Sequence, residues 1–241
     1  MLRIIDARTG RPTDPAPLRR GLTRVEAYVS GDDLTALRVL LVADVLVRTL
    51  ELGGTPVWEL LDADVERAEL RASAAALGIR PFEESRDVGQ ALGAAQAVHV
   101  VERGTRVPGG VVLAVAPVDP ATGPPPPGTD PSALRLALLA VDRAEPARLD
   151  PRTLEEARAT LTDWRGTVAG WARSPSRPVP AEIRNRLRAA WENDLDVPGV
   201  LRILHQVAAE PGLPDGARFE TYAYADRLLA LELTRDLGAP V

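Results

Sequence analysis

The first half of the chain alternates short apolar runs with one long helical repeat. Residues Val25 to Val29 alternate in polarity and are rich in β-forming residues, which predicts a strand. From Leu34 to Leu52, apolar residues return every three or four positions, which predicts a helix that stops at Gly53. Pro56 to Leu61 predicts the next strand. A strand, a helix and a strand in this order predict a βαβ unit with a parallel sheet.

Similar patterns predict five further elements before residue 116. These are strands at Leu2–Asp6, Ala97–Val101 and Gly110–Val115, and helices at Asp64–Leu77 and Ser85–Ala95. Arg103 to Gly109 is glycine-containing and polar, so we expect it to connect the last two strands as a hairpin.

A proline-rich segment separates this part from a helical second half. Residues 117–131 hold seven prolines, which excludes a regular helix or a central strand. We therefore expect a reduced Rossmann-like domain over residues 1–116, a linker over 117–131 and a helical stem bundle over 132–241. The predicted fold class is α/β, with a truncated Rossmann-like (HUP-type) parallel sheet followed by an all-α helical bundle.

Helix caps and apolar periodicity predict five helices in the second half. Asp130-Pro131 and Asp150-Pro151 each begin one, since proline suits the first helical turn. The other three are expected at Pro180–Trp191, from Val197 to about Ala209, and at Ala217–Leu237. The expected core residues are Tyr222, Leu228, Leu229, Leu231, Trp164, Trp171 and Trp191, although the tryptophans also fit a partner surface.

Composition restricts the chemistry more than the fold. The 241 residues carry a net charge of -5, which disfavours general attraction to nucleic acids. There is no cysteine, so disulfides, thiolate zinc sites and a catalytic thiol are excluded. All 29 basic side chains are arginine, so a phosphate clamp would need arginine or backbone N–H groups. Without a signal peptide or an apolar span in the sequence, we expect a cytoplasmic protein without membrane contact.

Several runs occur in an order that resembles one known family. Leu2–Asp6 looks like its opening strand, and Ala27-Tyr28-Val29-Ser30-Gly31 is similar to its Met-Tyr-Val-Cys-Gly. Leu61–Asp64 resembles a Thr-Asp-Ile-Asp motif, and Ser132–Leu139 resembles the Ala-Leu-Arg run that opens its stem. Asn193–Pro198 resembles Asp-Asp-Leu-Asn-Thr-Pro. The family is the cysteinyl-tRNA synthetases of class I, together with the ligase that joins cysteine to a glucosaminyl-inositol in mycothiol synthesis.

The chain departs from this family where the family's chemistry resides. The segment that carries His-Ile-Gly-His in the family is shortened, and Leu37–Leu40 stands near its place. The proline-rich segment replaces the Lys-Met-Ser-Lys-Ser loop. Ser30 stands where the first zinc-binding cysteine is expected, and a hydroxyl is a poor zinc ligand. The resemblance also ends near the stem helices, so no anticodon-binding domain is expected.

The residues around the first βαβ unit are candidates for a relict ligand pocket. The candidate set is Tyr28, Ser30, Gly31, Asp32, Asp33, Asp62, Asp64 and Arg135. Ser30–Asp33 also fits a strand-to-helix turn with a helix N-cap, the interpretation we favour as its sole role. Asp62 and Asp64 fit either a carboxylate pair for acid–base or Mg²⁺ chemistry, or a helix cap.

The remaining polar candidates admit structural explanations as well. Arg135 fits a phosphate contact or a pairing with a carboxylate. His99 is expected on a strand and His205 on a helix, both as structural residues. The arginines Arg184, Arg186 and Arg188 fit a solvated helix face better than an RNA-contacting stripe.

These observations favour a catalytically inactive paralogue that binds an unknown protein or small-molecule partner. We expect no cofactor: zinc lacks its ligands, and Asp32 and Asp33 place negative charge where a triphosphate would sit. tRNA is a weaker partner candidate. The alternative is a divergent ATP-dependent aminoacyl ligase or adenylating enzyme that uses Ser30, Asp32, Asp33, Asp62, Asp64, His99 and Arg135.

Overall fold

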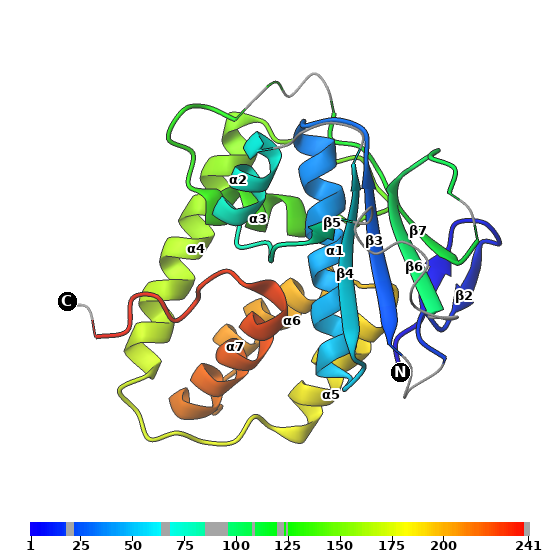
Figure 1. Ribbon diagram of the computed structural model, residues 1–241. Coiled ribbons are helices and arrows are strands. Elements are labelled where there is room, and N and C mark those ends of the chain that lie inside the picture. Colours follow the sequence, from blue (N-terminus) through cyan, green and yellow to red (C-terminus); the bar gives the residue numbers. More distant parts are fainter. Residues whose placement is uncertain are drawn as a thin grey trace. The chain divides into compact units, whose positions relative to one another are not determined.

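The computed structural model describes most of the chain as two compact units (Figure 1). Described are residues 1–17, 22–63, 68–84, 96–107, 109–119, 123 and 125–238, without the side chain of Ala63. Unit 1 comprises residues 1–124, 143–148 and 192–195, and unit 2 comprises residues 125–142, 149–191 and 196–241. The predicted domain boundaries stay a prediction, but two short segments of the second half belong to unit 1.

Unit 1 is built on a five-stranded parallel sheet, which confirms the predicted α/β class. The strand order is β5-β4-β3-β6-β7, so the first strand of the βαβ unit lies in the centre. The strands are β3 (Thr23–Val29), β4 (Val57–Ala63), β5 (Glu83–Glu84), β6 (Gln96–Glu102) and β7 (Val111–Val115). Tyr28 is opposite Asp62 on β4 and Val101 on β6, so side chains from three strands share one level of the sheet.

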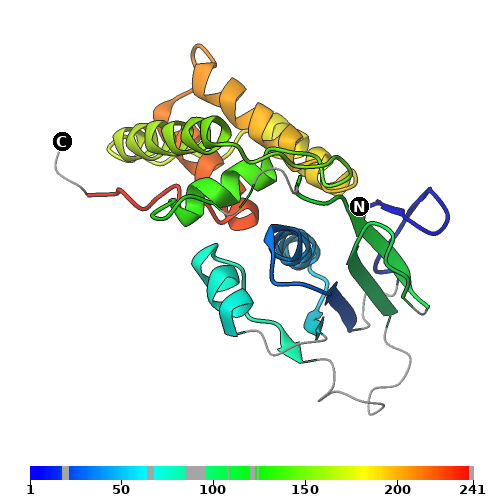
Figure 2. The same cartoon turned by 90° about the horizontal axis from the view of Figure 1, so that it is seen from above.

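Helix α1 (Leu34–Leu52) covers one face of this sheet, at the bounds that the sequence predicted. Val25, Ala27 and Val29 of β3 are buried, as expected for alternate positions of a strand packed beneath a helix. Helix α2 (Ala68–Ala76) lies beside α1 on the same side (Figure 2). The residues before α2, and the helix predicted at Ser85–Ala95, lie outside the described residues.

The opposite face of the sheet carries buried polar side chains. Glu26 and His99 are opposite one another in the register of β3 and β6, and both are buried. The Tyr28 hydroxyl donates to Glu26 Oε2 at 2.8 Å. Since a buried polar group must be compensated, these side chains have to satisfy one another.

The connection between β6 and β7 is not the hairpin that the sequence predicted. The two strands pair in parallel, with Val98 opposite Val111 and Val101 opposite Ala114. Gly104 and Gly110 adopt positive φ angles of 97° and 65°, which let the chain turn back tightly. Parallel strands usually need a longer, helical crossover. The short, polar, glycine-containing connection therefore did not indicate that β7 runs parallel to β6.

A small hairpin and two later segments complete unit 1. Strand β1 (Ile4–Asp6), which confirms the predicted first strand, pairs antiparallel with β2 (Arg11–Thr13), which was not predicted. Arg3 bridges to Asn193, and Arg143 pairs with Asp194. Residues 143–148 and 192–195 therefore act as parts of the sheet unit despite their place in the sequence.

Unit 2 is helical, as the capping pattern predicted. Its helices are α3 (Pro131–Leu139), α4 (Pro151–Trp171), α5 (Ala181–Glu192), α6 (Val197–Ala209) and α7 (Asp215–Leu229). Asp130, Asp150 and Asp196 each accept a hydrogen bond from a backbone N–H in the first turn of α3, α4 and α6. None of the helices in the described part of the chain has both the length and the apolar character that a membrane crossing requires.

Aromatic residues form the centre of unit 2. Trp164 and Trp171 of α4 contact Tyr222 of α7 edge-on, with ring centroids 5.7 and 5.2 Å apart. Tyr222 is fully buried, and its hydroxyl donates to the Leu204 carbonyl at 2.9 Å. The tryptophans, including Trp191, are buried, which confirms the prediction of a bundle core.

The last helix ends earlier than predicted. Helix α7 stops at Leu229, Ala230 is left-handed with φ 48°, and the chain leaves the helical path. The Asp226 carboxylate accepts from the backbone N–H groups of Leu231 and Leu233, which stabilises this departure. The prediction of a helix to Leu237 was wrong because these contacts override the local helix propensity.

Candidate functional site

One pocket of unit 1 lies where the strand order changes direction. The chain passes from β3 to β4 and β5 on one side and places β6 on the other side of β3. A cavity of about 340 Å³ opens at the carboxyl ends of β3 and β6. Open parallel sheets bind ligands at such a switch point, because the loops after neighbouring strands diverge there. The fold therefore marks this cavity as the first candidate site.

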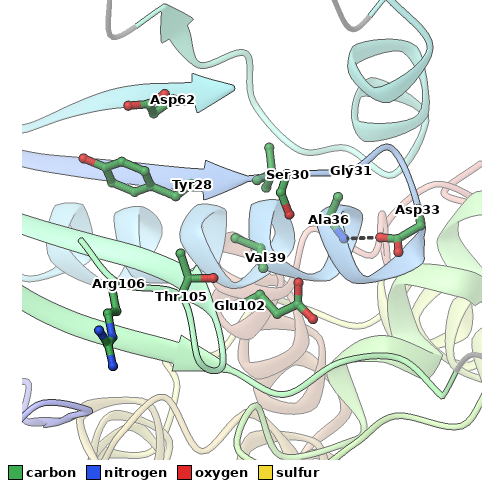
Figure 3. Close-up of a pocket in the computed structure, with 11 residues that line it drawn as sticks. Tyr28, Ser30, Gly31, Asp33, Ala36, Val39, Asp62, Glu102, Thr105 and Arg106 are labelled. Carbon is green, nitrogen blue, oxygen red and sulfur yellow. Dashed lines mark hydrogen bonds between the residues drawn. The ribbon is translucent and has the colours of Figure 1, made fainter. Parts of the chain in front are cut away.

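The charged residues in the lining of this pocket are mainly acidic. Asp33, Asp62 and Glu102 contribute carboxylates and Arg106 contributes the one guanidinium among the lining residues that the structure describes. In Figure 3 the side chains of Ser30 and Glu102 extend into the space between the end of β3 and the β6–β7 connection. The Arg106 guanidinium points away from Asp62 in the same view. The pocket thus offers a negative field to a ligand.

Helix α1 does not offer its N-terminus to an anion here. Asp33 is the N-cap, and its Oδ1 accepts from Ala36 N at 2.9 Å (Figure 3). This bond uses an N–H group that would otherwise be available to a phosphate. The charge of Asp33 also opposes a second anion at the same place. The turn that we favoured from the sequence is confirmed as an N-cap, and it also lines the cavity.

The buried side chains behind the pocket influence Tyr28. His99 Nδ1 lies 3.2 Å from Glu26 Oε2, and the two rings of His99 and Tyr28 meet edge-on at 5.4 Å. His99 lowers the pKa of Glu26, against the opposing effect of burial, and the Tyr28 hydroxyl lowers it further. Burial and the neighbouring Glu26 raise the pKa of Tyr28 well above its usual range. Tyr28 therefore stays a neutral hydrogen-bond donor to Glu26.

Arg38, near the place where the resemblance would put the histidine motif, serves the structure. Its side chain is 1% exposed. Nη1 donates to the carbonyl of Ala116 at 2.8 Å and to that of Glu145 at 2.7 Å. These bonds tie α1 to the segment after β7 and to residues 143–148. Arg38 is thus a structural clamp within unit 1.

The structure brings together most, though not all, of the residues predicted from the sequence. Tyr28, Ser30, Gly31, Asp33 and Asp62 line the same pocket. Asp32 is exposed and is not part of this lining.

Two predicted site residues, Asp64 and Arg135, are not in the pocket lining. Asp64 lies outside the described residues. Arg135 is fully buried in unit 2, where its Nε donates to the Leu229 carbonyl at 2.6 Å. Besides this backbone contact, the positive charge of Arg135 acts on the Asp226 carboxyl and favours its ionised form. Both groups belong to unit 2, and Arg135 is not part of the pocket lining.

Sequence reasoning missed the third side of the pocket. Glu102, Thr105 and Arg106 come from the end of β6 and the connection after it. The polar residues directly after a predicted strand were a usable signal, because the carboxyl ends of parallel strands meet at one edge. The hairpin interpretation concealed that signal, because it treated Arg103 to Gly109 only as a connection between two strands.

The donors in this pocket do not fit the zinc ion that the family resemblance implies. The chain has no cysteine, and its two histidines do not line the cavity. Among the described residues, no group of three or more acidic or histidine side chains is placed to hold a metal ion. Ser30 offers a neutral hydroxyl, which binds zinc poorly compared with thiolate or imidazole.

The sheet and its switch-point pocket define unit 1 as a Rossmann-like α/β unit of the kind that binds small ligands. Over 44% of its length, the chain is 34% identical to the L-cysteine:1D-myo-inositol 2-amino-2-deoxy-alpha-D-glucopyranoside ligase of Acidothermus cellulolyticus. It is 36% identical over 44% of its length to the corresponding ligase of Streptomyces avermitilis, and equally to the cysteine–tRNA ligase of Paracoccus denitrificans. No known family model matches the chain.

These similarities confirm the resemblance to cysteine ligases of the class I synthetase type. The aligned part spans 25% of the Acidothermus ligase, 26% of the Streptomyces ligase and 20% of the Paracoccus ligase. The relationship is thus to ligases, and it rests on less than half of this chain.

Proposed function

We propose that this chain is a catalytically inactive relative of the cysteine ligases that binds a small, amine-bearing ligand in the switch-point pocket. The pocket keeps the position at which Rossmann-like sheets take ligands. Its charge is suited to a cation, and so to a partner other than a nucleoside triphosphate. In this proposal neither zinc nor ATP is a cofactor.

One observation carries the proposal: Asp33, Asp62 and Glu102 oppose a single arginine in the lining. Adenylate formation needs positive charge at the developing phosphate, and losing one such contact usually costs about 10²–10³ in rate. Here carboxylates stand where cations are needed, and Asp33 occupies the N-terminus of α1. A protonated amine would pair with the carboxylates, which attract it and do not repel it.

The names of the relatives are compatible with an amine-bearing ligand. The ligases of Acidothermus and Streptomyces act, by name, on L-cysteine and an amino sugar derivative of inositol. Both of these compounds carry an amino group. Retention of an amine pocket after loss of catalysis would explain why the strand ends persist while the phosphate-binding motifs are missing.

Catalysis is tested by amino-acid-dependent exchange of pyrophosphate into ATP, with cysteine and a panel of other amino acids. We expect no exchange above the protein-free background. Binding is tested by thermal shift with ATP, AMP, cysteamine, glucosamine and an uncharged alcohol of similar size, because ligands that bind only the folded state raise its stability. We expect shifts with the amines and none with ATP.

The matched variants are Asp62→Asn and Glu102→Gln, which remove charge at nearly constant shape. Each should weaken amine binding by about ten- to a hundredfold, since a charge-assisted hydrogen bond contributes roughly 1.5–3 kcal/mol. Glu69→Gln is the control, because Glu69 is exposed on α2 and lies outside the pocket lining. Exchange activity, or an ATP shift without any amine shift, would contradict the proposal.

The alternative is a divergent ATP-dependent aminoacyl ligase with unusual active-site residues. A specific observation in its favour is a second hollow beside the pocket, which is lined by Arg8, Arg103 and Arg106. All the relatives named above are ligases. The same exchange assay separates the two functions, because only the alternative predicts turnover of ATP.

A further inference from the structure

A second hollow of unit 1 has the opposite charge to the switch-point pocket. It lies beside the β6–β7 connection and has a volume of about 390 Å³. Arg8, which follows β1, and Arg103 and Arg106, from the connection itself, line it together. The lining that the structure describes includes no carboxylate. Three cations around one hollow are unusual in a chain whose net charge is -5.

The arginines of this hollow are not neutralised by acidic side chains of the described chain. Arg8 Nη2 donates to the Val107 carbonyl and Arg103 Nη2 donates to the Ala144 carbonyl. Arg106 makes no hydrogen bond or ion pair with the residues that the structure describes. Elsewhere in unit 1, arginines such as Arg48 and Arg80 pair with Asp44. Like charges held together without a counter-charge favour the entry of an anion.

The acidic residue nearest to Arg8 in the sequence, Asp6, already accepts hydrogen bonds. Asp6, at the end of β1, accepts from the backbone N–H groups of Arg8 and Val112 at 3.1 and 3.2 Å. Its second oxygen accepts from the Thr9 hydroxyl at 3.3 Å. The carboxylate of Asp6 therefore fixes the turn that presents Arg8.

Beneath the arginines the hollow is apolar. Val101 and Val112 are nearly fully buried, and Ala114 completes the strand residues in the lining. These side chains belong to β6 and β7, whose register brings Val101 opposite Ala114. An apolar floor beneath several cationic donors suits a molecule with one anionic group and a short carbon body.

The connection that carries two of the arginines is held close to the sheet. A Cβ at Gly110 would lie 2.6 Å from His99 Nε2 and 2.8 Å from the Ala97 carbonyl oxygen. Only glycine permits this approach, and its φ of 65° also suits glycine. The wall of the hollow at the start of β7 is thus set by close backbone packing, while its three arginines are exposed side chains.

We propose that this hollow binds the carboxylate or phosphate group of a small organic molecule, with guanidinium groups of Arg8, Arg103 and Arg106 as donors. Arginine presents paired N–H groups that match both anions. The carbon body of the ligand packs on Val101, Val112 and Ala114. The site lies beside the switch-point pocket, with which its lining shares Thr105 and Arg106, and it does not rest on the proposed amine binding there.

Isothermal titration of the full chain tests the site with four probes: butyl phosphate, butyrate, inorganic phosphate and butylamine. Butyl phosphate against butyrate distinguishes a phosphate from a carboxylate ligand, and inorganic phosphate shows the contribution of charge without the carbon body. We expect at least one butyl anion to bind more tightly than inorganic phosphate, with an affinity that decreases as salt is added. Failure of every anion to bind at about 20 mM, some twenty times a weak Kd of 1 mM, would overturn the proposal.

Arg106→Gln is the decisive variant, because this exposed side chain has no partner among the described residues and its loss should leave the fold intact. The anion affinity should decrease about tenfold while the unfolding midpoint stays unchanged. Arg152→Gln, on an exposed face of α4, should change neither. Unchanged anion binding in Arg106→Gln would refute the site. Anion binding that persists in Asp62→Asn shows that this site does not depend on the amine pocket.

Discussion

Two groups of arginines, one in each unit, are used in opposite ways. In unit 2, Arg135 and Arg165 are buried and direct their guanidiniums to the carbonyls of Leu229 and Leu231 at the end of α7. In unit 1, Arg8, Arg103 and Arg106 surround a hollow and find no carboxylate among the described residues. Arg8 and Arg103 each reach one backbone carbonyl and all three side chains are exposed, so donors remain for a ligand. The buried arginines instead stabilise the fold through their carbonyl contacts.

This difference distinguishes arginines that stabilise the fold from arginines that are placed to bind a ligand. A buried guanidinium is tolerated only when its donors are satisfied, so Arg135 and Arg165 must be parts of the fold. An exposed guanidinium with no protein acceptor costs little in stability, and its position is explained better by a ligand. Substitutions should therefore affect stability at the buried arginines Arg135 and Arg165, and binding at the exposed arginines of the hollow.

The largest effect is expected for Arg135→Ala. The substitution leaves the Leu229 carbonyl without its donor and removes a positive charge that acts on Asp226, so the free energy of unfolding should decrease by about 3–5 kcal/mol. Urea unfolding followed by tryptophan fluorescence measures it, since Trp164, Trp171 and Trp191 lie in unit 2. Arg152→Ala should change stability by less than about 0.5 kcal/mol. A loss below about 1 kcal/mol for Arg135→Ala would break the comparison.

Gly110→Ala tests the frame of the hollow in unit 1. The new Cβ meets His99 and the backbone is left-handed, so we expect a loss of about 2–3 kcal/mol and weaker anion binding. Gly109→Ala is the matched control, because Gly109 has a φ of 58° but no atom within 4 Å of the new Cβ. It should cost only about 1 kcal/mol. Equal losses in the two variants would show that the approach to His99 is unimportant.

Asp33→Ala should cost less, about 1 kcal/mol, because it removes one helix cap from α1. Asp130→Ala removes the corresponding cap from α3 in unit 2 and should cost a similar amount. Only Asp33→Ala should reduce amine binding, since Asp33 also lines the pocket. Equal amine affinity in both variants would show that Asp33 acts only as a helix cap and does not bind the amine.

The smallest effects are two carboxyl titrations of opposite direction. The pKa of Glu26 is lowered by His99, so its contribution to stability is present above the unfolded pKa and is lost as the pH decreases through the folded pKa. Burial raises the pKa of Asp226, despite the N–H groups of Leu231 and Leu233. Its contribution is present below the unfolded pKa and is lost as the pH increases through the folded pKa.

Carbon-detected NMR of both side-chain carboxyl groups measures these pKa values directly. Glu26 should titrate below, and Asp226 above, their ordinary values of about 4.3 and 3.9. Glu26→Gln should make unit 1 less sensitive to acid. Titration of both groups on the same side of their ordinary values would contradict this part of the comparison.

Local structure was predictable where the cause lies within a few residues. Helix α1 has the predicted bounds because its apolar repeat, the Asp33 cap and the Gly53 stop all act within one or two helical turns. The caps Asp130 and Asp150 predicted the starts of α3 and α4 for the same reason. In the candidate site, Tyr28, Ser30, Gly31 and Asp33 could be named because they follow one another in the sequence.

The errors arose where distant parts of the chain decide the outcome. Asp226, in the last turn of α7, stabilises the departure of the chain after Leu229, and the distant Arg135 and Arg165 bind carbonyls at the same place. The parallel pairing of β6 and β7 depends on Gly110 packing against His99 across the sheet. The sequence shows where the glycines are, but not which residues of the neighbouring strand they contact.

By itself, the sequence determined the α/β class, the central helix, the bundle, the resemblance to cysteine ligases and the absence of cysteine and lysine. The tertiary structure alone decided that Glu102 joins Asp33 and Asp62, and that Arg8 joins Arg103 and Arg106. Periodicity and capping act over a few residues and leave a local pattern. The charge of a pocket depends on which strands become neighbours, and that follows from burial of the whole sheet.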